Sequence, residues 1–336
     1  MDIVLLFVIM KMIKTSVKGE DKMAQDKDAL SIDVAKLYYE SDMSQQKIAN
    51  KLGISRPSVS RFLQYAKEQG FVQIKIVDPI DLRQSLGDKL CKKYHLKDAI
   101  IANAPLDDDQ ELKKAIGQTA ASYLWKIVKD NDIIGVGWGS SLYQMALQLK
   151  TKPVKGVQVV QLKGGISYSK VNTYAHEIVT LVADAFSTTG IFLPIPVMFD
   201  NVEVKRLVEH DKYVKNILDM GKKANIAVVT VGTASSESIL FHLGYYIDDK
   251  DRELLSKKAA GDLCSRFYDD DYNIVDEELN ARTVGLQLDE FKKKETRILV
   301  AGGKEKIRAI HTALKAGYMN VLITDRYTAL ALENLT

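Results

Sequence analysis

Residues 44–62 read SQQKIANKLGISRPSVSRF, and this stretch decides the fold of the N-terminal part of the chain. Ser44 precedes a short amphipathic run and has the side chain of a helix N-cap. Gly53 supplies the left-handed residue that ends such a helix, and Ser55 provides the N-cap of a second helix soon after it. The stretch therefore predicts two short helices joined by a tight turn.

The spacing of three small or branched residues indicates the kind of turn. Ala49 lets the two helices approach, Gly53 makes the turn, and Val59 fills the space between them, as in a helix-turn-helix motif. In that motif the second helix enters the major groove of DNA. Pairs of helices around a glycine also occur in proteins that never bind DNA, so the local charge must decide between the two interpretations.

The local charge favours DNA. Residues 24–42 contain two basic and five acidic residues, whereas residues 43–76 contain six basic residues and one acidic residue. Phosphate contacts supply much of the affinity for DNA, and a basic patch on the reading element is the expected footprint. We therefore predict binding to double-stranded operator DNA, in which arginine suits guanine and serine suits phosphates or base edges. The predicted contacts are Ser44, Gln45, Ser55, Arg56, Ser58, Ser60 and Arg61.

The composition is that of a globular protein with about two domains. The 336 residues are 46% hydrophobic and 27% charged, which excludes disordered, collagen-like and coiled-coil chains. Cys91 and Cys264 are too few for a disulfide framework or a cysteine-based zinc site, and they place the chain in a reducing cytoplasm. The net charge of +3 does not identify a polyanionic partner by itself. The five histidines have no metal-binding spacing, so neither a metal nor a cofactor is expected.

The N-terminal module has an extension before it and a linker after it. The extension contains the apolar run IVLLFVIM over residues 3–10, whereas a membrane-spanning helix needs about 20 apolar residues. The charges around the run do not fit a signal peptide, so we expect residues 1–23 to be an unstructured extension without a membrane role. The DNA-binding domain is expected over residues 24–80, with a strand-like run at 71–76 that suits either a wing or a strand leading out of the domain. A linking helix is expected over residues 82–94.

Residues 81–336 show short apolar runs that alternate with amphipathic segments. This alternation predicts an α/β domain whose mostly parallel sheet is covered by helices on both faces. Strands are expected at residues 99–102, 133–137, 157–162, 191–194, 226–232, 298–301 and 321–324, and helices at residues 111–129, 141–149, 173–186, 202–220, 304–315 and 327–335. Ligands of such sheets bind at the carboxyl ends of the strands, so these ends are where a site is expected.

Two of the expected strand ends carry residues suited to a phosphorylated or carbonyl ligand. Residues 135–141 read GVGWGSS, in which glycines let backbone amides approach an anion at the start of the next helix. A tight structural turn would have the same sequence. Lys163 leaves an apolar strand just before two glycines, so it could pair with a phosphate or, with a lowered pKa, form an imine with an aldehyde. The simpler alternative is a lysine that reaches the rim of the sheet.

Further polar residues follow at other loops. Asp262 and Arg266 are suited to a sugar hydroxyl and a phosphate, respectively. Lys304 opens a helix after Ala301-Gly-Gly and resembles an anion-binding position. The glycine spacing at residues 135–141 is not that of a dinucleotide-binding loop, and no ATP-binding loop is present in the sequence. The residues therefore indicate a phosphorylated ligand other than these nucleotides.

Taken as a set, these motifs resemble those of the SorC family of sugar-responsive transcriptional regulators. The resemblance rests on the helix-turn-helix at residues 44–61, FVQI at 71–74, GVGWGSS at 135–141, QLKGG at 161–165, GDLCSRF at 261–267 and LVAGGK at 299–304. It extends from about residue 28 to the end of the chain. Each motif alone is weak, and the set is specific.

The resemblance implies a repressor that a phosphorylated sugar releases from its operator. It implies an effector domain akin to phosphosugar isomerases, and oligomers that are usually tetramers. For the branch of the family that the chain is most similar to, it implies deoxyribose 5-phosphate as effector and control of deoxyribonucleoside catabolism. The effector-binding residues that it implies are Gly139, Ser140 and Ser141 for the phosphate, Lys304 as the distal phosphate partner, and Lys163, Asp262 and Arg266 facing the sugar.

A sugar-phosphate isomerase that carries a DNA-binding module is the alternative function. A fold of this class can host either activity, so the fold alone does not decide. An isomerase needs an acid–base residue above the substrate carbon, and no glutamate or histidine stands at an expected strand end. The sequence therefore favours a regulator over an enzyme.

Overall fold

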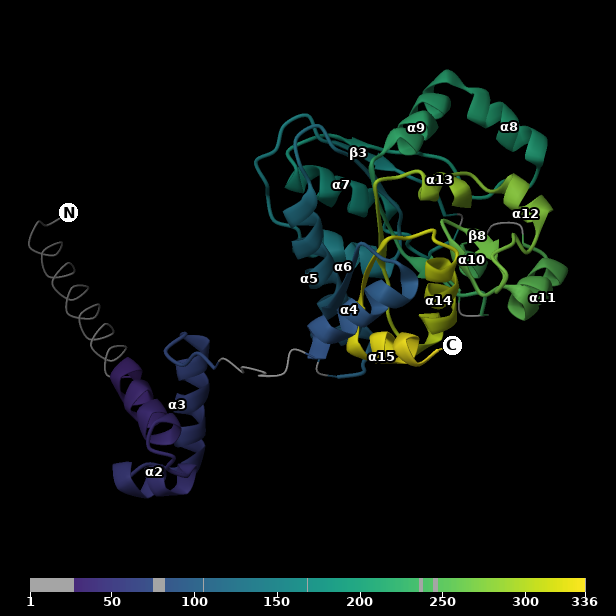
Figure 1. The fold of residues 1–336 in the computed structure, drawn as a ribbon. Helices are drawn as coiled ribbons and strands as arrows, with labels where there is room; N and C mark the ends of the chain where they lie inside the picture. Colours follow the sequence, from purple (N-terminus) through teal and green to yellow (C-terminus); the bar gives the residue numbers. More distant parts are fainter. Residues whose placement is uncertain are drawn as a thin grey trace, which may run out of the picture. The chain divides into compact units, whose positions relative to one another are not determined.

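The computed structural model describes residues 27–74 and 82–335, except for residues 105, 168, 236–237 and 244–246. The chain divides into two compact units, residues 1–79 and 80–336. Figure 1 shows the helices and strands of each unit. The expected extension over residues 1–23 lies outside the described residues.

Three helices form the described part of the small unit. They are a helix over residues 27–39, α2 (Gln45–Leu52) and α3 (Arg56–Glu68). Ala49 and Val59 are buried where α2 and α3 meet, as their spacing predicts. The buried core is made of Val34, Ala35, Ile48, Ala49, Val59, Leu63 and Ala66. Because these side chains come from all three helices, the small unit has a hydrophobic core of its own.

The ends of α2 and α3 follow the capping pattern of the sequence. The Ser44 hydroxyl accepts a hydrogen bond from the backbone N–H of Lys47, and the Ser55 hydroxyl accepts one from that of Ser58. Gly53 has φ +65°, a left-handed conformation that glycine adopts without steric cost. The turn between the two helices is therefore determined locally.

The expected wing strand is wrong for the residues that the structure describes. Phe71–Ile74 are not in a strand, and residues 75–76 lie outside the described part. The backbone N–H of Val72 donates to the carbonyl of Ala66, so the segment caps the end of α3 instead of pairing with a strand. The apolar and polar residues of FVQI alternate as in a strand, but in the structure Val72 packs against the core of the small unit without a strand being formed.

The large unit is built on a seven-stranded parallel sheet. Its strands, in spatial order, are β1 (Asp98–Ala102), β10 (Val321–Asp325), β9 (Thr296–Val300), β5 (Ile226–Val229), β2 (Ile133–Val136), β3 (Gln158–Gln161) and β4 (Gly190–Ile191). Every neighbouring pair in this sheet is parallel. Each strand overlaps one of the seven expected ranges, which confirms the mostly parallel α/β domain. Two ranges are wrong in extent: β4 ends at Ile191, where the strand expected over 191–194 begins, and the strand expected over 226–232 is two strands, of which only β5 belongs to this sheet.

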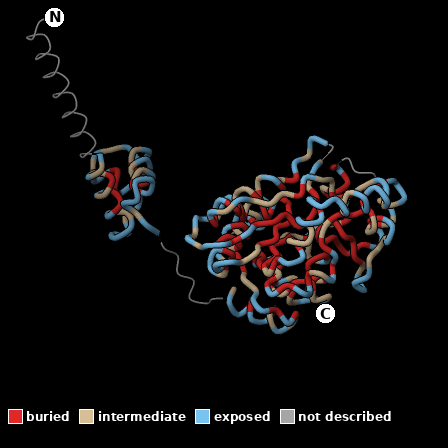
Figure 2. Tube along the Cα trace, turned by 90° about the horizontal axis from the view of Figure 1, so that it is seen from above, coloured by how far each residue is buried: buried red, intermediate tan, exposed pale blue. Residues whose placement is uncertain are grey.

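Helices cover both faces of this sheet. Their bounds are α4 (Leu82–Tyr94), α5 (Asp109–Ile127), α6 (Ser140–Gln148), α7 (Ala175–Ala185), α8 (Val202–His210), α9 (Lys212–Lys223), α10 (Ile239–His242), α11 (Asp249–Lys258), α12 (Glu277–Arg282), α13 (Leu288–Lys292), the 3-10 helix η1 (Lys304–Lys306), α14 (Ile307–Lys315) and α15 (Arg326–Asn334). Successive residues of β9 face different layers, because Ile298 packs in a core with α5, α6 and α7, whereas Leu299 packs with α4, α14 and α15. Figure 2 shows the buried chain segments running through the middle of this unit.

The helix expected over residues 202–220 is two helices. Asp211 ends α8 and caps α9, accepting hydrogen bonds from the backbone N–H groups of Tyr213 and Val214. An aspartate side chain competes with the backbone for these donors, which interrupts a helix that the apolar periodicity alone would continue. The break turns the chain between the two helices.

A second, three-stranded antiparallel sheet was not expected from the sequence. It consists of β6 (Val231–Gly232), β7 (Gly261–Leu263) and β8 (Arg266–Tyr268). Strands of two or three residues are too short to show an alternation of apolar and polar side chains. This small sheet matters because β6 and β7 carry residues that line the candidate site.

Candidate ligand-binding site

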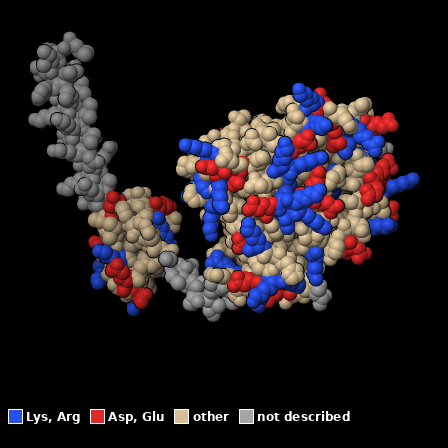
Figure 3. All heavy atoms as spheres, turned by 45° about the horizontal axis from the view of Figure 1, so that its top comes forward, with Lys and Arg blue, Asp and Glu red and all other residues tan. Residues whose placement is uncertain are grey.

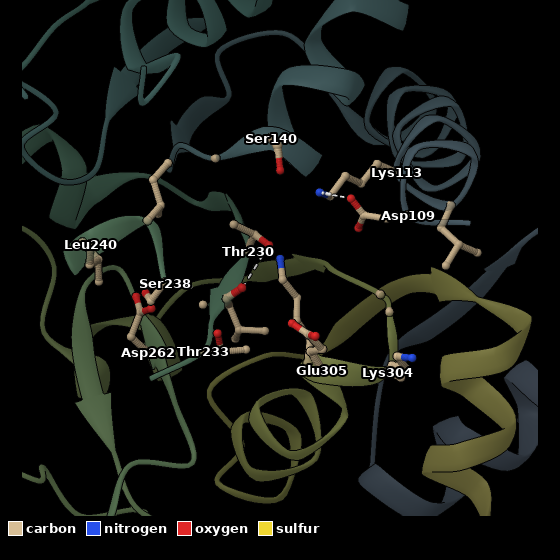
Figure 4. Close-up of a pocket in the computed structure, with 18 of the residues that line it drawn as sticks. Asp109, Lys113, Ser140, Thr230, Thr233, Ser238, Leu240, Asp262, Lys304 and Glu305 are labelled. Atoms are coloured by element: carbon tan, nitrogen blue, oxygen red, sulfur yellow. Dashed lines mark hydrogen bonds and ion pairs between the residues drawn. The ribbon is translucent and has the colours of Figure 1, made fainter. Parts of the chain in front are cut away.

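A cavity of about 570 Å³ lies in the large unit, where several strands of the parallel sheet end. Its walls come from the segments after β2, β3, β5 and β9 and from β7, with the start of α5 at one side (Figure 4). Residues far apart in the sequence thus meet at the carboxyl ends of parallel strands, as such sheets predict. Of the seven predicted effector-binding residues, Gly139, Ser140, Lys163, Asp262 and Lys304 line this cavity, whereas Ser141 and Arg266 do not.

The start of α6 forms one wall of the cavity. Gly139 has φ +139°, and a side chain there would be strained and would crowd Thr230. No side chain caps this helix, so its first backbone N–H groups are open to a ligand. Ser140 points its hydroxyl into the cavity in Figure 4. Ser141 is buried in the helix packing and stays outside the lining.

Lys163 lies at the inner end of the cavity, where it is only 5% exposed. Its Nζ donates a hydrogen bond to the Ser265 hydroxyl at 3.0 Å and lies 3.5 Å from the centre of the Trp138 ring. Burial lowers the pKa of the Lys163 amine, although the carboxylate of Asp262 opposes the shift. Lys163 is therefore not a lysine that reaches to the rim of the sheet, which corrects that alternative.

Asp262 is the acidic group beside Lys163. It is 4% exposed, and its Oδ2 accepts a hydrogen bond from the backbone N–H of Ser265 at 2.9 Å. Burial raises the pKa of this carboxyl group, against the opposing effects of the Lys163 charge and that hydrogen bond. Gly232 is required opposite it, because a side chain there would begin 2.0 Å from Asp262 Oδ1.

Lys304 and its loop do not have the geometry that the sequence predicts. The backbone N–H of Gly303 donates to the side chains of Asp325 and Thr328, so it is not free to bind an anion. Lys304 is exposed, and in Figure 4 its amine is directed away from the middle of the cavity. Lys304 thus stands at the rim and not at the centre of the candidate site.

Lys306 is a cation of the cavity that the sequence analysis missed. It is partly buried, and the structure gives its amine no hydrogen-bond or ion-pair partner among the described residues. Burial lowers the pKa of Lys306 to about 8, and the nearby charge of Lys113 adds to this shift. Lys113 itself is paired with Asp109 at 2.5 Å. Lys304 and Lys306 look equally suitable in the sequence. The 3-10 turn of η1 leaves Lys304 exposed and makes Lys306 partly buried, which no local pattern predicts.

Arg266 does not line the cavity, which contradicts the prediction that it faces a sugar there. It is 1% exposed, and its guanidinium donates to backbone carbonyls of four residues and to one side-chain amide oxygen. The acceptors are the carbonyls of Asn280, Thr283, Gly285 and Leu286 and the Oδ1 of Asn280. Arg266 therefore holds the 280–286 segment in place, and Gly285 of that segment bridges to Lys163.

The predicted DNA-contacting residues lie in the small unit, on α2, α3 and the two caps. Arg56, Ser60 and Arg61 are exposed on α3. Ser58 is partly buried and contacts the Ser55 hydroxyl at 2.9 Å, and Arg61 donates a hydrogen bond to it. Ser44 is the N-cap of α2, and Gln45 is the first residue of that helix. In the large unit, basic and acidic side chains are interspersed over the face seen in Figure 3.

Neither a metal centre nor a membrane span is found in the part of the chain that the structure describes. Among the described residues, no group of three or more histidine, cysteine, aspartate or glutamate side chains is placed so that it could hold a metal ion. No described helix is both long enough and apolar enough to cross a membrane.

The large unit has the sequence and fold of a known family of domains. Residues 78–333 match the Sugar-bind family of sugar-binding domains, and the chain belongs to this family. The full-length sorbitol operon regulator SorC of Klebsiella pneumoniae has a similar structure, with a TM-score of 0.70 and 29% identity over 92% of this chain and 100% of that chain. The protein is therefore a transcriptional regulator of the SorC/DeoR type with a sugar-binding domain.

Two relatives of known function are similar to this chain over nearly their whole length. The chain is 50% identical to the deoxyribonucleoside regulator of Bacillus subtilis over 312 residues, which are 93% of this chain and 99% of that protein. It is 30% identical to the sorbitol operon regulator of Klebsiella pneumoniae over 303 residues, which are 89% of this chain and 96% of that protein. Because these relatives are transcriptional regulators, the chain is a regulator and not an enzyme.

Proposed function

We propose that this protein is a DNA-binding repressor that deoxyribose 5-phosphate releases from its operator, and that it controls deoxyribonucleoside catabolism. The observation that carries the proposal is the buried amine of Lys163 in a cavity that also holds Lys306, a cation without a partner among the described residues, and an uncapped helix start at Ser140. A small molecule with both an aldehyde and a phosphate matches this arrangement. The aldehyde suits the Lys163 amine, and the phosphate suits Lys306 and the helix start at Ser140. The similarity to the deoxyribonucleoside regulator of Bacillus subtilis supports the same ligand.

The phosphate fits the open side of the cavity. Backbone N–H groups at the start of α6 and the Ser140 hydroxyl donate hydrogen bonds to phosphate oxygens, and Lys306 supplies a positive charge. Lys304 contributes at most long-range attraction, because it is exposed at the rim. Asp262, which lies next to Lys163, accepts a hydrogen bond from a sugar hydroxyl.

The aldehyde fits the inner end of the cavity. Deoxyribose 5-phosphate cannot close a six-membered ring, because its 5-oxygen carries the phosphate, so its open aldehyde is more available than that of a free pentose. The neutral amine of Lys163 is the nucleophile for such a group. Its nitrogen bonds to the aldehyde carbon, and the carbonyl oxygen leaves as water with the two amine hydrogens, which yields an imine. A hydrogen bond from Lys163 to the sugar is the non-covalent form of the same contact.

Operator binding belongs to the small unit in this proposal. Arg56, Ser60 and Arg61 are exposed on α3, which is the helix that would enter the major groove, and the caps Ser44 and Ser55 lie at helix starts that suit phosphates. We also propose that the protein acts in the cytoplasm as a homo-oligomer, a tetramer. The likeness to the SorC family supports this state and a relation of the effector domain to phosphosugar isomerases.

A ligand panel combined with an operator gel shift tests the proposal. Deoxyribose 5-phosphate at 100 times its dissociation constant should stabilise the protein by about 2.7 kcal/mol and release it from its operator. Free deoxyribose, which lacks the phosphate, should do neither at the same concentration. Stabilisation by another sugar phosphate alone, or release without any stabilisation, would contradict the proposed effector.

A further inference from the structure

The turn between β7 and β8 holds two consecutive residues in the left-handed region. Leu263 pairs with Arg266 across the hairpin, so Cys264 and Ser265 form a two-residue turn. Their φ values are +50° and +66°. Asparagine and glycine favour such turns, whereas other side chains meet steric cost there. Strained residues of this kind persist where their surroundings over-determine them, and they cluster at functional sites.

This strained turn brings the Ser265 hydroxyl to the Lys163 amine. Ser265 Oγ accepts the hydrogen bond from Lys163 Nζ at 3.0 Å, and the Ser265 backbone N–H donates to Asp262 Oδ2 at 2.9 Å. Ser265 is buried, so water does not replace either contact. The turn therefore connects the amine and the carboxyl group of the cavity through one residue.

The Trp138 ring occupies a second direction around the Lys163 nitrogen. The nitrogen lies 3.5 Å from the ring centre, and the ring is held by a hydrogen bond from its Nε1–H to the Gly164 carbonyl at 2.7 Å. A neutral amine has two hydrogens and one lone pair. With one hydrogen at the Ser265 hydroxyl and the other over the ring, the lone pair takes the remaining direction, away from both groups, on a side chain that lines the cavity. That is the orientation an amine needs to attack a carbonyl carbon.

We propose that Ser265 is a positioning residue for Lys163, whose hydroxyl fixes the direction from which the amine meets the aldehyde of the effector. This inference rests on the proposed function, because it requires an effector aldehyde at Lys163. Ser265 forms no bond with the ligand and acts through Lys163 alone. Its contribution should therefore appear with ligands that carry an aldehyde and disappear with ligands that lack one.

The test compares two ligands on the full-length protein and three variants. The ligands are deoxyribose 5-phosphate and 2-deoxyribitol 5-phosphate, in which the aldehyde is reduced to an alcohol. Ser265→Ala removes the hydroxyl and keeps the strained backbone, whereas Ser265→Gly removes the hydroxyl and relieves the strain. Cys264→Ala is the matched control, because it changes the same turn and leaves the Ser265 hydroxyl in place.

Both Ser265 variants should bind deoxyribose 5-phosphate about tenfold more weakly than the parent, since one oriented hydrogen bond is worth about this factor. Borohydride trapping of the adduct on Lys163 should slow by a similar factor. Affinity for 2-deoxyribitol 5-phosphate should change by less than about twofold. Ser265→Gly should melt at a higher temperature than Ser265→Ala while showing the same loss, which separates positioning from stability. Cys264→Ala should match the parent with both ligands.

Equal losses for the two ligands, or no loss for the aldehyde, would overturn the inference while leaving the proposed function intact. A loss that follows the melting temperature across the three variants would also overturn it, because it would indicate a structural role. A parent protein that binds neither ligand would contradict the proposed function itself, and the inference with it.

Discussion

At the scale of single residues, the candidate site depends on two lysine amines whose pKa values are lowered by burial. Burial disfavours the charged form of a lysine, so its pKa falls. Such a lysine is stabilised by pairing with an anion, or it reacts as a neutral nucleophile. Lys163 and Lys306 stand in one cavity and suit these two outcomes separately. Lys163 is held by neutral groups, a hydroxyl and a ring, whereas Lys306 has no recorded partner in the described part of the chain.

Lys163→Ala should keep operator binding and lose release by deoxyribose 5-phosphate, because it removes the contact to the aldehyde. Lys163→Arg should fail in the same way, since arginine stays charged and cannot form an imine. In the parent, the rate of borohydride-trapped adduct formation should rise with pH and level off below pH 10.5, because the pKa of the buried amine lies below that value. Peptide mass analysis locates the adduct. Normal release in the alanine variant would rule out both the covalent and the hydrogen-bonded role.

Lys306→Met should weaken binding of 2-deoxyribitol 5-phosphate by about 10- to 100-fold, the usual effect of a hydrogen bond to a charged group. Lys304→Met is the matched control and should stay within about twofold, because Lys304 is exposed at the rim. In the parent, affinity should fall as pH rises through about 8, where the free amine of Lys306 loses its proton. Calorimetric titration at several pH values measures both effects. The opposite ranking of the two variants would restore Lys304 as the phosphate partner.

At the scale of elements, local signals account for the helices of the small unit. The N-cap serines and the left-handed glycine act within a few residues, so α2 begins and ends, and α3 begins, where the sequence predicts. The wing and the helix over residues 202–220 were mispredicted because periodicity carries no information about competing partners. Val72 turns back onto the end of α3, and the Asp211 side chain caps a new helix.

Arg56→Ala and Arg61→Ala should weaken operator binding without unfolding the small unit, because both side chains are exposed on α3. Loss of a guanine contact would cost about 1–3 kcal/mol and relax the preference at one base pair, and loss of a phosphate contact would lower the salt dependence by about one unit of slope. Lys36→Ala, an exposed basic residue on the first helix, is the control and should bind like the parent. Gel shifts at several salt concentrations measure these effects. Unchanged binding in both arginine variants would show that α3 does not read the operator.

At the scale of the whole molecule, the effector and the operator concern two separate compact units. Each unit has its own buried core, seven residues around Ala49 in the small unit and larger clusters on both faces of the parallel sheet in the other. A ligand changes operator binding only if it has different affinities for two states of the protein. The regulation proposed here is therefore a property of the full chain and not of either cavity or helix alone.

A protein limited to residues 80–336 should fold and bind deoxyribose 5-phosphate with the affinity of the full chain, because every residue of the cavity lies in that unit. It should not bind the operator. Removal of residues 1–23 alone should change neither property, since that run is too short to span a membrane. Thermal shifts and gel shifts on the two shortened proteins check this. Membrane association that disappears with residues 1–23 would contradict the expectation for the extension.

The sequence by itself determined the features that act over short distances. Caps, the turn glycine and apolar runs are read within one helix or strand, so the two helices around Gly53 and the approximate positions of the seven parallel strands were predictable. A motif at a strand end indicated Lys163, and a motif at another loop indicated Asp262. Tertiary structure alone decided which polar groups are free to bind. The guanidinium of Arg266 donates its hydrogen bonds to carbonyls up to 20 residues away in the chain, so it is not available to a ligand. The amine of Lys306 lies in the cavity and has no partner among the described residues. Hydrogen-bond partners and burial depend on residues that are distant in sequence, and no local pattern specifies them.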